Sequence, residues 1–248
     1  MDVVVGSGPL ARTLARILGN QGGNTVLAGE EGAEGPFLWR RANPVSGESL
    51  LPAMTGAKRV FVILERPTPV HGVCAVIDRL QIERGVSVVP YGIGPIAALA
   101  KIPTWSHVDI GPCWGLEEPL IQTWSDIIAV GAHLWRFDPG PVFPVAMPVA
   151  VETILAAVDH PGARWRLPGH KTSLPYLASE LGLFHRHYLR ASDVAPRIAL
   201  WRLGLHRQHL RGWTVAPPAE GCTDAWLPTA PSGPAGWFAD LRSGGGRR

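Results

Sequence analysis

The sequence predicts an α/β fold in which a doubly wound parallel sheet carries helices on both faces and leads into a small, mostly helical C-terminal lobe. Strand-like and helix-like patterns alternate along the first 170 residues, and such alternation builds parallel sheets. The hydrophobic content of 46% in 248 residues is enough for one large core. A valine-rich strand at residues 3–5 runs directly into a glycine turn, which indicates the start of a βαβ unit.

The expected elements follow the chain in order. Short apolar runs between turn residues predict strands at 2–5, 25–28, 37–41, 59–64, 86–90, 133–136 and 164–167. Helical periodicity predicts a first helix that ends near Gly19, a second that Ser46 caps, and others at 70–84, 116–130, 149–158, 172–181 and 195–211. Residues 91–113 contain glycine and proline and are expected to form a long loop, a place where function is often found.

The glycine turn at Gly6-Ser-Gly-Pro-Leu-Ala11 has the spacing of a dinucleotide-binding turn. Gly6 permits a tight turn, Gly8 lets the backbone approach a pyrophosphate, and Ala11 lets the helix pack closely on the strand. The helix end then offers N–H groups and a positive dipole to the phosphates. Adding the acidic residue discussed next, the residues expected to hold the dinucleotide are Gly6, Ser7, Gly8, Pro9, Leu10, Ala11, Arg12 and Glu30.

The cofactor is predicted to be NAD or NADP. Glu30 follows the second predicted strand, about twenty residues beyond the glycines, where a carboxylate can bind the ribose 2′-hydroxyl of NAD. Arg12 and Arg40 argue for NADP, because arginine suits a 2′-phosphate. Glu30 favours NAD over NADP, although NADP stays open. The alternative to a ribose-binding role is that Glu30 is an ordinary solvated loop charge.

Composition narrows the class of protein. No apolar run is long enough to span a membrane, no signal peptide is evident, and three scattered cysteines form neither a disulfide framework nor a zinc pattern, so a cytoplasmic protein is expected. The net charge of +3 is mild. Six arginines lie within 186–211, but no nucleic-acid motif accompanies them, so a solvated helix face or a rim for an anionic substrate is favoured over RNA binding.

The predicted domain organisation is a dinucleotide-binding domain at 1–170, a substrate or cap lobe at 171–242, and a disordered tail at 243–248. Ten tryptophans are many for this length. Most are expected in the core, although an aromatic wall for an apolar or flat substrate is the functional alternative. The oligomeric state stays open, with a homodimer among the options.

The order of these landmarks resembles the extended or atypical branch of the short-chain dehydrogenase/reductase superfamily, including its NmrA-like and NAD-dependent epimerase-like members. The resemblance covers about residues 2–182. It rests on the glycine turn, Arg41-Ala-Asn43-Pro before a helix, Lys58-Arg-Val-Phe-Val-Ile63, Glu83-Arg-Gly-Val-Ser-Val-Val89, Leu134-Trp-Arg-Phe-Asp-Pro-Gly140, and Arg164-Trp-Arg-Leu-Pro-Gly169. It implies a Rossmann-type fold, an NAD(P) cofactor, a small-molecule substrate, and a C-terminal lobe that varies with substrate.

Two departures separate this chain from that family. The family's turn usually has one more residue and a third glycine. Its active members also carry a Tyr-x-x-x-Lys pair, in which the tyrosine shuttles the proton that accompanies hydride transfer. None of the lysines here (Lys58, Lys101, Lys171) has a tyrosine four residues before it. The resemblance therefore implies an oxidoreductase fold whose reaction could be redox-neutral, such as epimerisation, isomerisation or cyclisation, in specialised biosynthesis.

Three residues are candidates to replace the missing pair. Tyr91 follows a predicted strand near the place where the family has a substrate-binding serine. His107 titrates near neutral pH and is expected with Asp109 at the rim of the long loop. Asp126 lies on the presumed catalytic helix among tryptophans, which raise a carboxyl pKa. Each has a plain structural alternative: a bonded core tyrosine, a loop stabiliser and a solvated helix charge, respectively.

The sequence gives less support to other kinds of site. The histidines at 185, 187, 206 and 209 have spacings that zinc accepts, but they lie among arginines and lack a carboxylate or cysteine partner, so no metal site is predicted. No serine nucleophile elbow or P-loop lysine is present. The main alternative to an enzyme is a non-catalytic NAD(P) sensor or partner-binding regulator of the NmrA-like type, which the missing tyrosine and lysine favour.

Overall fold

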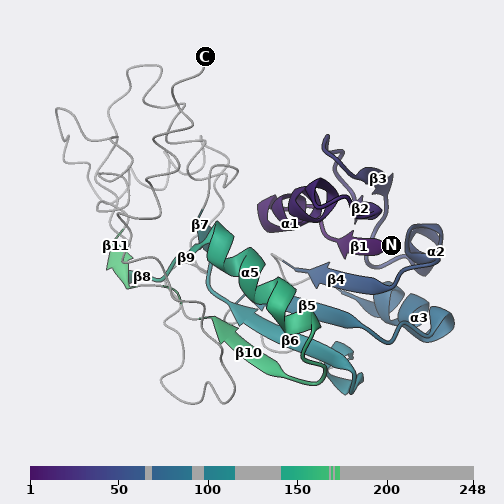
Figure 1. The fold of residues 1–248 in the computed structure, drawn as a ribbon. Helices are drawn as coiled ribbons and strands as arrows, with labels where there is room; N and C mark the ends of the chain where they lie inside the picture. Colours follow the sequence, from purple (N-terminus) through teal and green to yellow (C-terminus); the bar gives the residue numbers. More distant parts are fainter. Residues whose placement is uncertain (65–68, 91–97, 115–140, 168, 170, 174–248) are drawn as a thin grey trace, which may run out of the picture. The chain divides into compact units, whose positions relative to one another are not determined.

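The structure is a computed structural model that describes residues 1–64, 69–90, 98–114, 141–167, 169 and 171–173 (Figure 1). These residues belong to two compact units. The first unit contains residues 1–110 and 148–167, apart from the gaps just given. The second contains the described residues of 111–147 and those from 169 onward. The domain boundary expected at residue 170 stays a prediction.

The first unit is built on a seven-stranded sheet with the order β10-β6-β5-β4-β1-β2-β3. Every neighbouring pair in this sheet is parallel. The strands are β1 (Asp2–Val5), β2 (Thr25–Gly29), β3 (Leu38–Arg41), β4 (Arg59–Ile63), β5 (Gly85–Pro90), β6 (Trp105–Ile110) and β10 (Arg164–Leu167).

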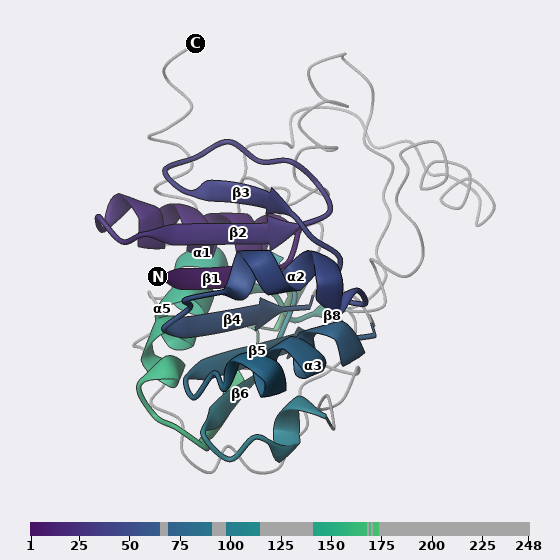
Figure 2. The same cartoon turned by 90° about the vertical axis from the view of Figure 1, so that its right-hand side faces the viewer.

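Helices cover both faces of this sheet. Figures 1 and 2 show α1 (Pro9–Asn20) and α5 (Met147–Val158) on one face, and α2 (Gly47–Met54) and α3 (His71–Leu80) on the other. A short 3-10 helix, η1 (Leu99–Lys101), precedes β6. The arrangement confirms the doubly wound α/β fold that the alternating pattern predicts. Among the described residues, no helix is long and apolar enough to cross a bilayer.

The core forms because successive strand residues alternate between the two helical layers. Val3 and Val5 of β1 join a buried cluster with α2 and α3, to which Val60 and Val62 of β4 also contribute. The intervening Val4 is also fully buried. Because both faces are covered, the strands read as continuous apolar runs. Ser46 caps α2 as predicted, and its side chain accepts a bond from the backbone of Ser49.

One core contact depends on a glycine, whose lack of a side chain leaves room for a tryptophan. Trp105 starts β6 and is fully buried, and its indole nitrogen donates to the carbonyl of Ile82 at 3.2 Å. It is the register partner of Gly85 on β5. A Cβ at Gly85 would overlap the six-membered ring of Trp105. The glycine therefore leaves the space that the indole of Trp105 fills.

Two sequence predictions are wrong in the described part of the chain. The loop expected at 91–113 contains η1, the six-residue strand β6 and the start of a second-unit strand. The helix expected at 172–181 does not begin at Thr172, because Thr172–Ser173 form a strand, and its residues 174–181 lie outside the described residues. The helices expected at 116–130 and 195–211 and the strand at 133–136 lie outside the described residues.

The described residues of the second unit form two small ladders. β7 (Cys113–Trp114) pairs in parallel with β9 (Val145–Ala146), and β8 (Pro141–Val142) pairs antiparallel with β11 (Thr172–Ser173). Gly111 lets the backbone approach closely here, because a Cβ would lie 2.7 Å from the carbonyl oxygen of Phe143.

Candidate functional site

The strand order places a topological switch point at the end of β1. From β1 the chain builds outward through β2 and β3 on one side, and β4, β5 and β6 then build outward on the other. The carboxyl ends of the neighbouring strands β1, β2 and β4 therefore lie side by side at Val5, Gly29 and Ile63. In open parallel sheets, ligands bind in the crevice beyond the strand ends at such a point. The glycine turn begins here.

Gly6 is required by its backbone and by its neighbours. Its φ of +156° is one that side-chain-bearing residues rarely adopt. A Cβ would also lie 2.7 Å from the carbonyl oxygen of Ile63 and 3.0 Å from the Cβ of Ala11. Ala11 is fully buried, so a larger residue there would press against the turn. The roles predicted for Gly6 and Ala11 therefore have a steric basis in the contact between the turn, β4 and α1.

The N-terminus of α1 has the properties of an anion site. Gly8 is the N-cap, with φ −81° and ψ 178°, a conformation open to most residues, so backbone geometry does not explain why glycine stands there. As a glycine, Gly8 makes no side-chain cap, and the first turn carries no acidic residue. Pro9 at the first helical position has no N–H to offer. The positive end of the helix dipole is thus not neutralised by a first-turn acid.

The turn is packed against the end of β2. A Cβ on Gly29 would lie 2.5 Å from the carbonyl oxygen of Gly6 and 2.7 Å from Oγ of Ser7. The backbone N–H of Gly6 donates to the carbonyl of Ala28 at 2.9 Å, and the N–H of Glu30 donates to Oγ of Ser7 at 2.9 Å. The second glycine-dependent contact of the site is therefore at Gly29, which the sequence motif does not include.

Arg12 braces the turn from α1. Its Nη1 donates to the carbonyl of Ser7 at 2.9 Å and lies 3.7 Å from a carboxylate oxygen of Glu31. The second arginine weighed for a 2′-phosphate, Arg40, is on β3 as the register partner of Ala28. One of the two arginines that argue for NADP is thus engaged by the protein itself.

Glu30 is fixed at both its backbone and its side chain. Besides the N–H bond to Ser7, Oε1 of Glu30 accepts a hydrogen bond from Nδ2 of Asn43 at 2.7 Å. Asn43 is fixed in turn, because its Oδ1 accepts the N–H of Val45 at 2.7 Å and its own N–H donates to Oγ of Ser49 at 3.0 Å. The hydrogen bond to Asn43 uses one carboxylate oxygen, and the other is available to a ligand hydroxyl.

His107 lies in the interior of β6, not in a loop rim as predicted. Its Nδ1 is 2.6 Å from Oγ of Ser87, which is its register partner on β5 and is 2% exposed. Burial lowers the pKa of His107, the nearby Arg164 lowers it further, and Asp109 partly opposes this. The histidine is therefore held neutral and hydrogen-bonded, and its proposed acid–base role stays a prediction.

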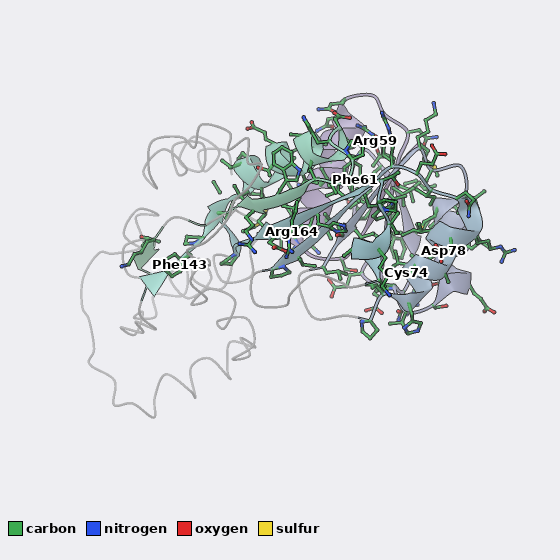
Figure 3. All side chains as sticks on the ribbon, turned by 90° about the horizontal axis from the view of Figure 1, so that it is seen from below. Arg59, Phe61, Cys74, Asp78, Phe143 and Arg164 are labelled. Atoms are coloured by element: carbon green, nitrogen blue, oxygen red, sulfur yellow. The ribbon has the colours of Figure 1, made fainter. Side chains whose placement is uncertain are left out.

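Asp109 forms ion pairs with two arginines on the neighbouring strand. Its Oδ2 lies 3.0 Å from Nη2 of Arg164, which Figure 3 labels, and 3.6 Å from Nε of Arg166. Arg166 is its register partner on β10. Asp109 thus forms ion pairs within the sheet. The structural alternative to a functional role is that of a loop stabiliser, but Asp109 stabilises a pair of strands instead.

The other candidates divide between buried and undescribed positions. Leu10 and Ala11 are 3% and 0% exposed, so their side chains belong to the core and only their backbone can reach a ligand. Tyr91 and Asp126 lie outside the described residues. Asn43, which sequence reasoning noted only as part of a family landmark, holds the predicted ribose ligand; no short-range sequence signal identifies that contact.

The comparisons with known proteins agree with this architecture. No protein-family model matches the sequence, and no curated protein matches it. Solved structures do match. UDP-glucose 4-epimerase with UDP-glucose from Thermotoga maritima has a TM-score of 0.63 at 11% identity and covers 78% of this chain and 87% of its own. A partial consensus L-threonine 3-dehydrogenase has a TM-score of 0.66 at 11% identity, with 98% and 99% covered.

A third similar structure is the Bordetella bronchiseptica enzyme WbmH in complex with NAD+, with a TM-score of 0.58 at 11% identity, covering 76% of this chain and 83% of its own. This chain has the same fold. The match confirms the Rossmann-type α/β architecture that the resemblance to epimerase-like short-chain dehydrogenases implied. At these identities the comparison concerns the fold, and the site must be argued from its own residues.

Proposed function

We propose that the chain binds a nicotinamide dinucleotide over the glycine turn, with NAD preferred to NADP. The observation that carries the proposal is the acid-free start of α1 at the switch point, with a fixed carboxylate at the end of the neighbouring strand. WbmH, which shares the fold, is in complex with NAD+. When bound, the dinucleotide supplies a hydride acceptor or donor.

The residues present fit such a group. The backbone at Ser7 and Gly8 would receive the diphosphate, because α1 begins there and has no first-turn acid. Ser7 adds a hydroxyl that already accepts the N–H of Glu30 and so retains its own proton to donate. Glu30 would accept a ribose hydroxyl through its second oxygen, since Asn43 occupies the first.

The preference for NAD follows from charge. A 2′-phosphate beside Glu30 would meet an acidic side chain, and like charges in contact cost affinity. Arg12 offers limited compensation, because it already bonds the carbonyl of Ser7 and lies near Glu31. We expect NADH to bind at least tenfold more tightly than NADPH, a difference of about 1.4 kcal/mol.

For the reaction, we propose an enzyme that acts on a small organic molecule, in a redox or redox-neutral conversion. The sugar-nucleotide epimerases among the similar structures support the redox-neutral version. The ten tryptophans favour an apolar or aromatic substrate, and specialised biosynthesis in the cytoplasm is the matching context. Tyr91, His107 and Asp126 remain the candidate acids and bases. Replacing Tyr91 with Phe should cut turnover at least about tenfold if its phenol is the acid.

The second candidate is a non-catalytic NAD(P)-sensing regulator. The absence of Tyr-x-x-x-Lys from the whole sequence favours it. The two candidates differ in whether any substrate is converted in the presence of the dinucleotide. An enzyme should convert at least one member of a panel of alcohols, sugar nucleotides and aromatic alcohols, seen as NADH at 340 nm for a redox conversion or as a new product by NMR for a redox-neutral one. A regulator should bind NAD+ and leave both the dinucleotide and every member of the panel unchanged.

The decisive experiment on the cofactor is Gly8→Asp. At this N-cap position the backbone geometry suits aspartate, which is a favoured capping residue, so the variant should fold as stably as the parent. The new carboxylate would occupy and repel the diphosphate, so NADH affinity should fall more than a hundredfold. Gly8→Asn is the matched control, because it caps equally well and carries no charge.

The measurement is a titration with NADH, followed by energy transfer from protein tryptophans to the nicotinamide. Steric blocking by either side chain lowers affinity, and the additional loss in Gly8→Asp reports the charge of the ligand. If Gly8→Asp binds NADH as the parent does, the glycine turn is not a phosphate site and the proposal fails.

A further inference from the structure

A chain of hydrogen bonds runs from α2 to the glycine turn through two intermediate residues, Asn43 and Glu30. Ser49 on the first turn of α2 accepts the N–H of Asn43, Asn43 donates to Glu30, and the N–H of Glu30 donates to Ser7 in the turn. The links measure 3.0, 2.7 and 2.9 Å. Asn43 is the central member, because it joins the connection after β3 to the end of β2.

The orientation of the Asn43 amide follows from chemistry. Its Oδ1 faces the N–H of Val45 at 2.7 Å, which requires an acceptor, and its Nδ2 faces the carboxylate of Glu30, which requires a donor. A flipped amide would place its NH2 donor against the N–H donor of Val45 and its carbonyl acceptor against the carboxylate of Glu30. Aspartate would satisfy Val45 and repel Glu30. Among side chains of this size, asparagine alone supports both contacts.

An exposed glutamate needs such support if it is to select a ligand. Glu30 is exposed, and fixing a free glutamate side chain costs up to about 2 kcal/mol of conformational entropy, which ligand binding would otherwise have to supply. The adjacent Glu31 takes another direction, toward Arg12 at 3.7 Å. The two neighbouring carboxylates are thus separated, with one held by a neutral amide and the other near a cation.

We propose that Asn43 is a positioning residue for cofactor selection: it holds the carboxylate of Glu30 in the orientation that accepts the ribose 2′-hydroxyl. This inference rests on the proposed NAD site. Asn43 acts through Glu30, so its removal should affect the choice between NADH and NADPH more than it affects stability or the binding of the shared diphosphate.

The test uses Asn43→Ser in the full-length protein. The serine hydroxyl can accept the N–H of Val45 in a turn of the same kind, but it is too short to reach Glu30. We expect NADH affinity to fall about fivefold and NADPH affinity to change less than twofold. Ser46→Ala is the matched control, because it removes the side-chain cap of α2 nearby and leaves the Asn43–Glu30 contact intact. It should lower the melting temperature with no change in the affinity ratio.

A double-mutant cycle with Glu30→Ala separates positioning from general loosening. In the Glu30→Ala background, Asn43→Ser should leave the NADH-to-NADPH ratio unchanged, because nothing remains to position. An equal loss for both nucleotides in Asn43→Ser, or the same ratio change with and without Glu30, overturns the inference. Failure of the unmodified protein to bind NADH refutes the proposed function instead, so the two failures are distinguishable.

Discussion

Gly29→Ala tests whether the packing between β2 and the glycine turn sets the shape of the phosphate site. The added methyl would lie 2.5 Å from the carbonyl oxygen of Gly6 and 2.7 Å from Oγ of Ser7. Ordinary carbon–oxygen contacts are about 3.3 Å or longer, so the turn must move by about 0.8 Å. Retreat toward β4 is blocked, because Gly6 already lies too close to the carbonyl of Ile63 to admit a methyl group.

The magnitude follows from that displacement. Overpacking of this size typically costs about 1–3 kcal/mol, and each kcal/mol lowers the melting temperature of a chain of this length by roughly 2–4 °C. A shift of about 0.8 Å takes a normal hydrogen bond beyond its range. Losing one hydrogen bond to a charged phosphate costs about 1.5–3 kcal/mol of binding free energy, so NADH should bind about 10- to 100-fold more weakly.

Two measurements check this prediction, thermal unfolding followed by circular dichroism and NADH titration followed by tryptophan fluorescence. Gly47→Ala is the matched control, because a Cβ there meets its nearest neighbour, the carbonyl of Gly72, at an ordinary 3.5 Å. It should change neither quantity appreciably. A Gly29→Ala protein that melts like the parent and binds NADH within twofold of it would show that the turn is not constrained by β2, and the steric reasoning would be refuted.

Further predictions concern stability. The lowered pKa of His107 means that the folded state favours the neutral imidazole, so stability is full above about pH 6.5 and falls on acidification as the unfolded chain takes up the proton. His107→Asn should flatten the dependence of unfolding free energy on pH between 7 and about 5.5 in denaturant titrations; a slope equal to that of the parent would contradict it. Arg59 makes a bidentate contact with Asp2 at 2.9 and 2.6 Å and lies over the ring of Phe61 at 5.7 Å (Figure 3). Arg59→Met should cost about 1–3 kcal/mol, since Asp2 keeps a largely covered carboxylate without its partner, and the Asp2→Asn, Arg59→Met double variant should recover part of this loss in the same assay.

The first half of the sheet was predictable because its sequence is locally consistent. The strands ending at Val5 and Ile63 are unbroken apolar runs, and Ser46 has an unambiguous capping position. The strand at Trp105–Ile110 was not predictable in the same way. Its polar residues looked like loop residues. In the structure, Ser106 bonds the carbonyl of His160 and His107 bonds Ser87, partners that lie far away in sequence.

In the candidate site, too, local features could be predicted from the sequence and contacts between distant segments could not. The glycine turn is a local motif, so Gly6 and Ala11 could be assigned their packing roles from the sequence. The contact of Gly29 with the turn and the bond from Asn43 to Glu30 join segments 22 and 13 residues apart or more. Such contacts depend on strand register, which a single sequence does not encode in any short pattern.

Gly85 and Trp105 form a complementary pair across two strands, and the consequence reaches beyond this chain. Neither residue can be exchanged alone: a side chain at 85 collides with the indole, and a smaller residue at 105 leaves a void costing about 3–5 kcal/mol. In descendants of the same ancestor, the two positions should therefore change together or not at all. A lineage that keeps the tryptophan but carries a bulky residue opposite it would have to have rebuilt this corner of the sheet.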